Sequence, residues 1–185
     1  DAGFYDLLVH SQDQAFDVAS WVTAMSDTGW TLAGFAQPAL YDLGQFVEES
    51  GNLDPLQRMA TAEELRGTIK THVGYARPSA APSPVWPVMA DRIPHLANIP
   101  AATLAQAVAS GNIPPLRIGS ERIMLKIRAE AAPLIAAING THSVQALAEI
   151  AGLSPDKALR LWAQIDKALT PWGMVHYSGI AAKRR

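Results

Sequence analysis

The spacing of the glycines constrains what this 185-residue chain can fold into and bind. No two of its 13 glycines lie two residues apart, so the sequence contains no G-x-G turn. In a doubly wound α/β domain that binds a nucleotide cofactor, this turn lets the backbone approach the phosphates at the start of a helix. We therefore expect no cofactor-binding residues within this chain.

The composition indicates a globular protein. Hydrophobic residues make up 49% of the chain and charged residues 17%, values typical of sequences that bury a core. No apolar run approaches the roughly 20 residues that a membrane-spanning helix needs, so we expect a soluble, cytoplasmic protein. The chain has no cysteine and its histidines show no H-E-x-x-H spacing, so we expect neither disulfides nor a metal site.

The first 78 residues alternate between strand and helix patterns. Asp17 can cap the first turn of a helix, and Gly29 can close that helix in a left-handed conformation. The other predicted elements are a strand at 6–10, a strand at 30–35, a helix at 54–70 that is interrupted near Ala60, and a strand at 71–76. This alternation is typical of part of an α/β sheet.

A proline-rich stretch indicates a domain boundary. Residues 77–87 (RPSAAPSPVWP) contain four of the 13 prolines, a composition that resists both helix and sheet. We therefore divide the chain into an α/β segment at 1–78, a linker with one helix at 79–119, and a further domain at 120–185.

The order of elements in residues 120–185 is that of a winged helix-turn-helix. The patterns predict three helices followed by a strand, at 128–138, 143–151, 154–169 and 174–177. The predicted fold class is therefore α+β, in which a partial α/β segment precedes a mainly helical, winged-helix-like domain.

The charge is divided unevenly between the two ends of the chain. Residues 1–113 carry 5 basic and 12 acidic side chains, whereas residues 114–185 carry 10 basic and 5 acidic ones. In the last predicted helix, Lys157, Arg160 and Lys167 share the face opposite the apolar stripe and are candidates for contact with nucleic acid or a partner. The pattern favours an ordinary solvated face over DNA binding.

A polar and aromatic cluster precedes the first predicted helix. It consists of Tyr5, Asp6, His10 and Asp13. These side chains are candidates for lining a substrate cleft in an intact enzyme. The alternative is that they form an ordered entry to the helix at Asp17.

Several short blocks resemble a bacterial group of class I S-adenosylmethionine-dependent methyltransferases. The blocks are residues 4–10 (FYDLLVH), 28–35 (TGWTLAGF), 38–42 (PALYD) and 63–75 (EELRGTIKTHVGY). In that group, these elements follow the cofactor-binding half and complete its sheet. A C-terminal appendage, described as regulatory and ending in a small winged helix, comes next.

The resemblance implies that this chain is the C-terminal region of such an enzyme. S-adenosylmethionine would then bind to the parent protein, and no catalytic, cofactor-binding or metal-binding residue is assigned to this chain. The partners expected are the missing N-terminal methyltransferase domain and a second copy of the chain. The region would serve substrate binding, regulation or partner docking. The alternative is a DNA-binding, winged-helix transcription regulator.

Overall fold

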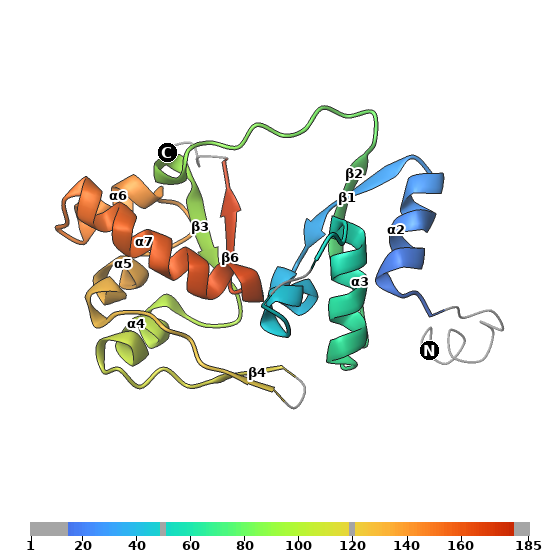
Figure 1. Cartoon of the computed structure of the whole chain (residues 1–185). Coiled ribbons are helices and arrows are strands. Elements are labelled where there is room, and N and C mark those ends of the chain that lie inside the picture. The colour runs from blue at the N-terminus through green and yellow to red at the C-terminus, as the bar shows by residue number, and fades with distance from the viewer. Residues whose placement is uncertain (1–14, 49–50, 119–120, 180–185) are drawn as a thin grey trace, which may run out of the picture. The chain divides into compact units, whose positions relative to one another are not determined.

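The protein has an α+β architecture made of helices and small sheets (Figure 1). The computed structural model describes residues 15–48, 51–118 and 121–179. The chain divides into two compact units: unit 1 comprises residues 1–33 and 41–80, and unit 2 comprises residues 34–40 and 81–185. Among the described helices, none has the length and apolar character that a bilayer crossing requires.

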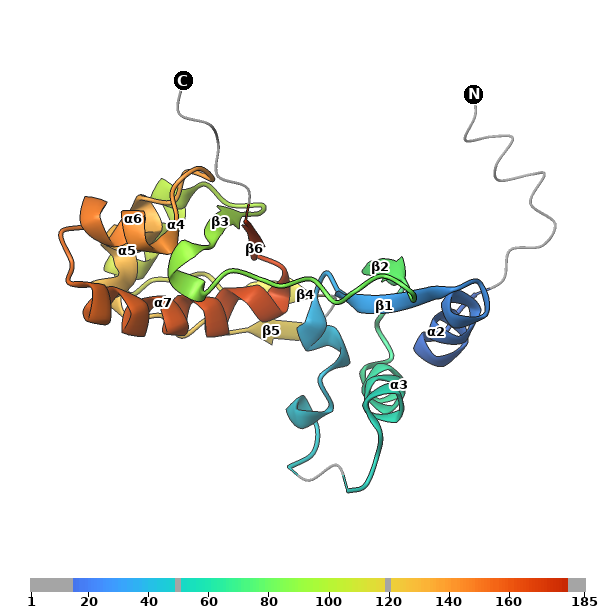
Figure 2. The same cartoon turned by 90° about the horizontal axis from the view of Figure 1, so that it is seen from above.

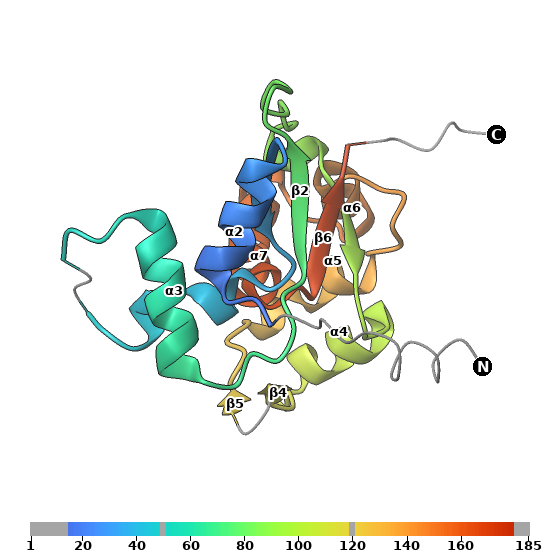
Figure 3. The ribbon, with the colours of Figure 1, turned by 90° about the vertical axis from the view of Figure 1, so that its right-hand side faces the viewer.

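The described part of unit 1 contains two helices, α2 (Val18–Asp27) and α3 (Pro55–Arg66), the turn η2 (Leu43–Gln45) and the strand β2 (Gly74–Pro78). Strand β1 (Trp30–Phe35) begins in unit 1 and ends in unit 2, and the turn η1 (Pro38–Tyr41) falls mainly within residues 34–40 of unit 2. Strands β1 and β2 pair with each other. Helices α2 and α3 lie on the same side of this sheet (Figures 2 and 3).

Local capping fixes the bounds of α2, as the sequence predicted. The Asp17 carboxylate accepts a hydrogen bond from the Ser20 backbone N–H at 2.7 Å and another from the Ser20 hydroxyl at 2.6 Å. These bonds lower the pKa of Asp17. After the last turn, Gly29 has a φ of 81°, a conformation that side chains with a Cβ disfavour. The predicted strand at 6–10 lies outside the described residues.

Helix α3 corrects two expectations. The predicted break near Ala60 is wrong, because α3 is continuous from Pro55 to Arg66. Asp54 caps its start with a capping box, and Gly67, with a φ of 61°, ends it. The following strand begins at Gly74 and not at residue 71.

Unit 2 combines short strands with a helical core. Its elements, in chain order, are η3 (Met89–Asp91), β3 (Ile93–Leu96), α4 (Ala101–Ala109), β4 (Leu116–Ile118), β5 (Glu121–Ile123), η4 (Ala129–Ala131), α5 (Ala132–Ala136), α6 (Val144–Ile150), α7 (Pro155–Leu169), η5 (Thr170–Trp172) and β6 (Val175–Ser178). The helix expected at 128–138 is therefore shorter and begins as a 3₁₀ turn. Within the expected linker at 79–119, residues 116–118 form strand β4, which pairs with β5 in a hairpin.

The strand after α7 pairs with a strand from the other end of unit 2. Strand β6 lies antiparallel to β3, with Ile93 opposite Ser178 and Leu96 opposite Val175. Strand β3 is not apparent in the sequence pattern, because Pro94 interrupts a run of only four residues. The pairing places β3, which follows the proline-rich stretch at 77–87, beside β6.

A single apolar cluster holds unit 2 together. Trp162, Leu134, Ile135 and Leu169 have no more than 1% of their surface exposed. Helix α4 contributes Leu104, Ala105 and Val108 to the same cluster.

A hydrogen-bond network at the edge of this cluster ties β6 to α7. The Tyr177 hydroxyl donates to Asp166 Oδ1 at 2.6 Å and accepts from Trp162 Nε1 at 3.0 Å. The Thr170 hydroxyl donates to the same Asp166 oxygen at 2.7 Å. Burial, followed by the hydrogen bond to Asp166, raises the pKa of Tyr177, so the tyrosine remains a donor throughout the neutral range.

We expect Tyr177→Phe to lower the free energy of unfolding by about 1–3 kcal/mol, because it leaves the buried Trp162 N–H without its acceptor and removes one of the two hydroxyl groups that donate to Asp166 Oδ1. Urea denaturation followed by tryptophan fluorescence measures this loss. Tyr75→Phe is the matched control, since Tyr75 is 57% exposed. Equal stability of the two variants would show that the network contributes nothing.

Candidate functional site

The four candidate cleft residues lie in a part of the chain that the structure does not describe. Tyr5, Asp6, His10 and Asp13 all fall within residues 1–14, ahead of the first described residue. Their assignment to a cleft, or to an ordered helix entry, stays a prediction.

The three candidate cations lie on one exposed face of α7. Lys157, Arg160 and Lys167 are exposed, whereas the opposite face is buried. The predicted inward stripe of this helix is confirmed, and its members are Ala158, Leu161, Trp162, Ile165 and Leu169. Helical spacing was sufficient to separate the two faces, because the pattern repeats over four turns.

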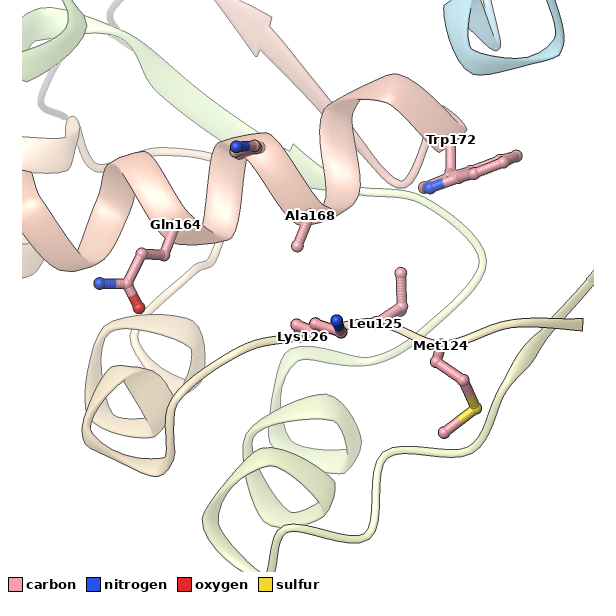
Figure 4. A pocket seen from close by; sticks show the side chains of 7 residues that line it. Met124, Leu125, Lys126, Gln164, Ala168 and Trp172 are labelled. Atoms are coloured by element: carbon pink, nitrogen blue, oxygen red, sulfur yellow. The ribbon is translucent and has the colours of Figure 1, made fainter. Parts of the chain in front are cut away.

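One end of this cationic face borders a cavity of about 380 Å³ (Figure 4). Helix α7 and the turn that follows it supply one wall, and an extended segment after β5 supplies the other. The lining residues are Met124, Leu125, Lys126, Gln164, Lys167, Ala168 and Trp172. Lys167 is therefore a cavity residue, whereas Lys157 and Arg160 are not among the residues that line it. The sequence did not single out Lys126, because it lies 41 residues before Lys167 and only the fold brings the two residues to one cavity. Trp172 was not singled out either, because it follows the predicted end of the helix.

A second polar cluster lies in unit 1 and centres on His72. The Nδ1 atom of His72 lies 2.8 Å from the Tyr41 hydroxyl. Its Nε2 atom lies 2.9 Å from the Phe16 carbonyl oxygen and 3.1 Å from Glu63 Oε1. The indole of Trp21 stacks on the imidazole with ring centroids 5.7 Å apart.

The acceptors around His72 favour one tautomer of a neutral ring. Two oxygen acceptors face Nε2, so a proton on this nitrogen satisfies them and leaves Nδ1 to accept from the Tyr41 hydroxyl. The other oxygen of Glu63 accepts a bond from the Val18 backbone N–H at 2.8 Å. The cluster thus joins the start of α2, helix α3 and the approach to β2.

The electrostatics of Tyr41 argue against nucleophilic chemistry in this cluster. Burial, followed by the negative charge of Glu63, raises the pKa of Tyr41 to about 12. An activated phenol would show the opposite shift. Tyr41 is only 5% exposed, so a substrate has little access to its oxygen. We assign the cluster a structural role in unit 1.

Sequence spacing gave no signal for this cluster. Tyr41, Glu63 and His72 come from a 3₁₀ turn, a helix and a segment between elements, and no short motif contains them. Among the residues that the structure describes, no group of three or more histidine or acidic side chains is arranged to hold a metal ion.

The raised pKa of Tyr41 predicts a loss of stability at high pH. Between about pH 10 and pH 12, the unfolded chain has lost the tyrosine proton while the folded chain keeps it, so the free energy of unfolding falls as pH rises. Tyr41→Phe removes this contribution and should flatten the decline. Urea titrations at several pH values, read from the ¹⁹F signal of fluorotryptophan at Trp21, measure it in unit 1.

Tyr75→Phe again serves as the control, because Tyr75 is largely exposed. Identical slopes for wild type and the Tyr41→Phe variant would contradict the assignment of a buried, protonated Tyr41.

Comparison with known proteins assigns no family to this chain. No family model matches the sequence, and no curated protein matches it.

Proposed function

We propose that this chain is a non-catalytic C-terminal region of an S-adenosylmethionine-dependent methyltransferase, in which it serves substrate binding, regulation or partner docking. The observation that carries the proposal is the incomplete sheet of unit 1. Among the described residues, this sheet has two strands, β1 and β2, with α2 and α3 on one side (Figures 2 and 3). A cytoplasmic location and a partner in the form of a second copy belong to the same proposal.

A two-stranded sheet is marginally stable by itself and gains stability when further strands extend it. Several apolar side chains in or next to β1 and β2 are exposed, and further strands could cover them. Trp30 is 45% exposed, Val73 59% and Tyr75 57%. An adjoining sheet would remove this apolar surface from water, which is favourable in proportion to the area buried.

Three of the four blocks that resemble the methyltransferase group fall on β1, β2 and the elements between them, and the block at 4–10 lies outside the described residues. Residues 28–35 span the end of α2 and strand β1, residues 38–42 span the turn η1, and residues 63–75 run from α3 into β2. In the group resembled, these elements complete a sheet whose first half binds the cofactor. The match between blocks and elements supports a complementary half in the parent protein.

The C-terminal part of unit 2 contributes a winged-helix-like module to this proposal. Helices α6 and α7 are joined by a short turn in which Gly152 has a φ of 66°. Strand β6 follows α7 and pairs with β3. This arrangement supports a docking or regulatory role for the exposed face of α7.

We expect the isolated chain to bind neither S-adenosylmethionine nor S-adenosylhomocysteine in calorimetry, and the longer parent protein to bind both. The reason is that the G-x-G turn, which lets the backbone approach the cofactor in such an enzyme, is absent from this sequence. Binding by the isolated chain would contradict this part of the proposal. Absence of binding by both proteins would favour the regulator considered below.

A matched pair of variants tests the sheet extension in the parent protein. Trp30→Glu places a charge on the exposed apolar surface beside β2 and should lower the melting temperature of the parent protein and weaken its cofactor binding. Val85→Glu introduces the same charge at a site that is 97% exposed and should change neither. Equal behaviour of the two variants would count against docking through this sheet.

The exposed cations of α7 favour a second candidate function, a DNA-binding transcription regulator. Lys157, Arg160 and Lys167 project from the second helix of a helix-turn-helix pair, which is the helix that enters the major groove in such proteins. Asp156 and Asp166 on the same helix reduce its positive charge.

If α7 binds DNA, the logarithm of the affinity for a 30-base-pair duplex should fall with the logarithm of salt concentration by about 0.9 for each phosphate neutralised. Replacing Lys157 and Arg160 with Gln should reduce that slope by about 2. Fluorescence anisotropy between low and physiological salt measures the slope. A flat response, or no binding at low salt, removes this function.

A further inference from the structure

The cavity beside α7 combines positive charge with an apolar surface. Its volume of about 380 Å³ lies within the range of small-molecule sites in proteins. Figure 4 shows Ala168 pointing from α7 toward the segment that carries Leu125 and Lys126. Sites of this size hold a ligand when an apolar lining is joined by a few polar groups that orient it.

The polar groups of the cavity select for an anion. Two ammonium groups, those of Lys126 and Lys167, lie among the seven described lining residues, and none of the seven is acidic. The nearest acidic residue along α7, Asp166, already accepts hydrogen bonds from Tyr177 and Thr170. Gln164 adds a carboxamide that can donate to an anionic oxygen.

The apolar groups of the cavity select for a flat or aliphatic body attached to that anion. Trp172 presents an indole, Met124 a thioether that is 64% exposed, and Leu125 and Ala168 aliphatic surface. An aromatic ring stacks favourably on an indole, and a methionine side chain adapts to ligands of varied shape. An inorganic anion alone would leave this surface in water.

Both walls of the cavity are anchored to the core of unit 2. The turn that carries Trp172 is closed by hydrogen bonds from the Gly173 N–H to the Thr170 carbonyl at 3.0 Å and from the Met174 N–H to the Leu169 carbonyl at 3.1 Å. On the opposite wall, Leu125 and Ile127 pack against the apolar cluster of unit 2. Successive side chains point in opposite directions along this extended backbone, so Lys126, between Leu125 and Ile127, is exposed.

We propose that this cavity binds a small organic anion: a carboxylate, sulfonate or phosphate group attached to an aromatic or otherwise apolar body. The ammonium groups of Lys126 and Lys167 bind the anionic group, and Trp172, with Met124 and Leu125, covers the apolar body. The proposal stands on the cavity of unit 2 alone and is independent of the methyltransferase assignment, which concerns the sheet of unit 1.

The test is a titration of the whole chain with three probes, followed by NMR through the indole N–H signal of Trp172, which Trp172→Phe identifies. The probes are 2-naphthoate, which has both the charge and the apolar body, neutral 2-naphthamide, and inorganic phosphate. We expect 2-naphthoate to shift the Trp172 signal with a Kd of about 0.1–1 mM, as suits a ligand of this size. The other two probes should bind at least about tenfold more weakly than 2-naphthoate.

Three lysine variants separate the cavity from general charge effects. Lys126→Gln and Lys167→Gln should each weaken 2-naphthoate binding about three- to tenfold, the range between an exposed and a partly desolvated charge interaction. Lys157→Gln makes the same charge change on the same helix outside the cavity lining and should leave the Kd within about twofold of wild type.

Four results would overturn the proposal. They are an unmoved Trp172 signal, equal binding of 2-naphthoate and 2-naphthamide, equal binding of 2-naphthoate and phosphate, and equal weakening by Lys157→Gln and Lys167→Gln. Because all three lysine sites are exposed, their replacement leaves the apolar cluster intact, and an unchanged pattern of backbone NMR signals confirms the fold of each variant.

Discussion

The apolar face of α7 is the constraint on which the rest of unit 2 depends. Trp162, Ile165 and Leu169 are fully buried on this helix. The burial of each side chain stabilises the folded protein by roughly 1.5–3 kcal/mol relative to leaving that side chain exposed. The indole of Trp162 also carries an N–H that needs an acceptor once it is buried. The Tyr177 hydroxyl supplies that acceptor and donates its own hydrogen bond to Asp166 Oδ1, so the packing of one helix determines where the last strand lies. Because β6 then pairs with β3, the same helix also fixes the first strand of the unit.

The two units are stabilised in different ways. Unit 2 has a continuous apolar cluster drawn from α4, α5, α6, α7 and β6. Among its described residues, unit 1 has few large buried side chains, and the Glu63 carboxylate on α3 accepts a hydrogen bond from the Val18 N–H at the start of α2 and contacts His72. Hydrogen bonds contribute little net stability beside apolar burial, and a small sheet needs more surface covered than two helices provide. A unit of this kind gains most from a further folded partner, which is why the incomplete sheet carries the functional proposal.

The elements that the sequence predicted correctly are those that local chemistry fixes. Asp17 and Gly29 mark the ends of α2 through groups within a few residues of each other, and the stripe from Ala158 to Leu169 follows from helical periodicity. The sequence did not predict β3 or the link between Tyr41, Glu63 and His72, because these arise from residues far apart in the chain. Strand β3 exists because β6, some eighty residues later, supplies its hydrogen-bond partners. Likewise, the interruption expected near Ala60 treated Thr61 and Glu64 as a capping box that starts a second helix, whereas helical hydrogen bonds already satisfy the backbone there.

The position of Lys167 links the cavity to the exposed face of α7. Lys157 and Arg160 lie on that face outside the cavity lining, whereas Lys167 contributes to both. An anion held between Lys126 and Lys167 would neutralise part of the positive charge at one end of the face and leave the other end unchanged. Electrostatic attraction of a polyanionic or acidic partner depends on the summed charge over about a Debye length, roughly 8–10 Å at physiological salt. Occupation of the cavity would therefore weaken the binding of such a partner most strongly near the C-terminal end of α7. There the fixed turn at Trp172 keeps the ligand and the helix in one geometry.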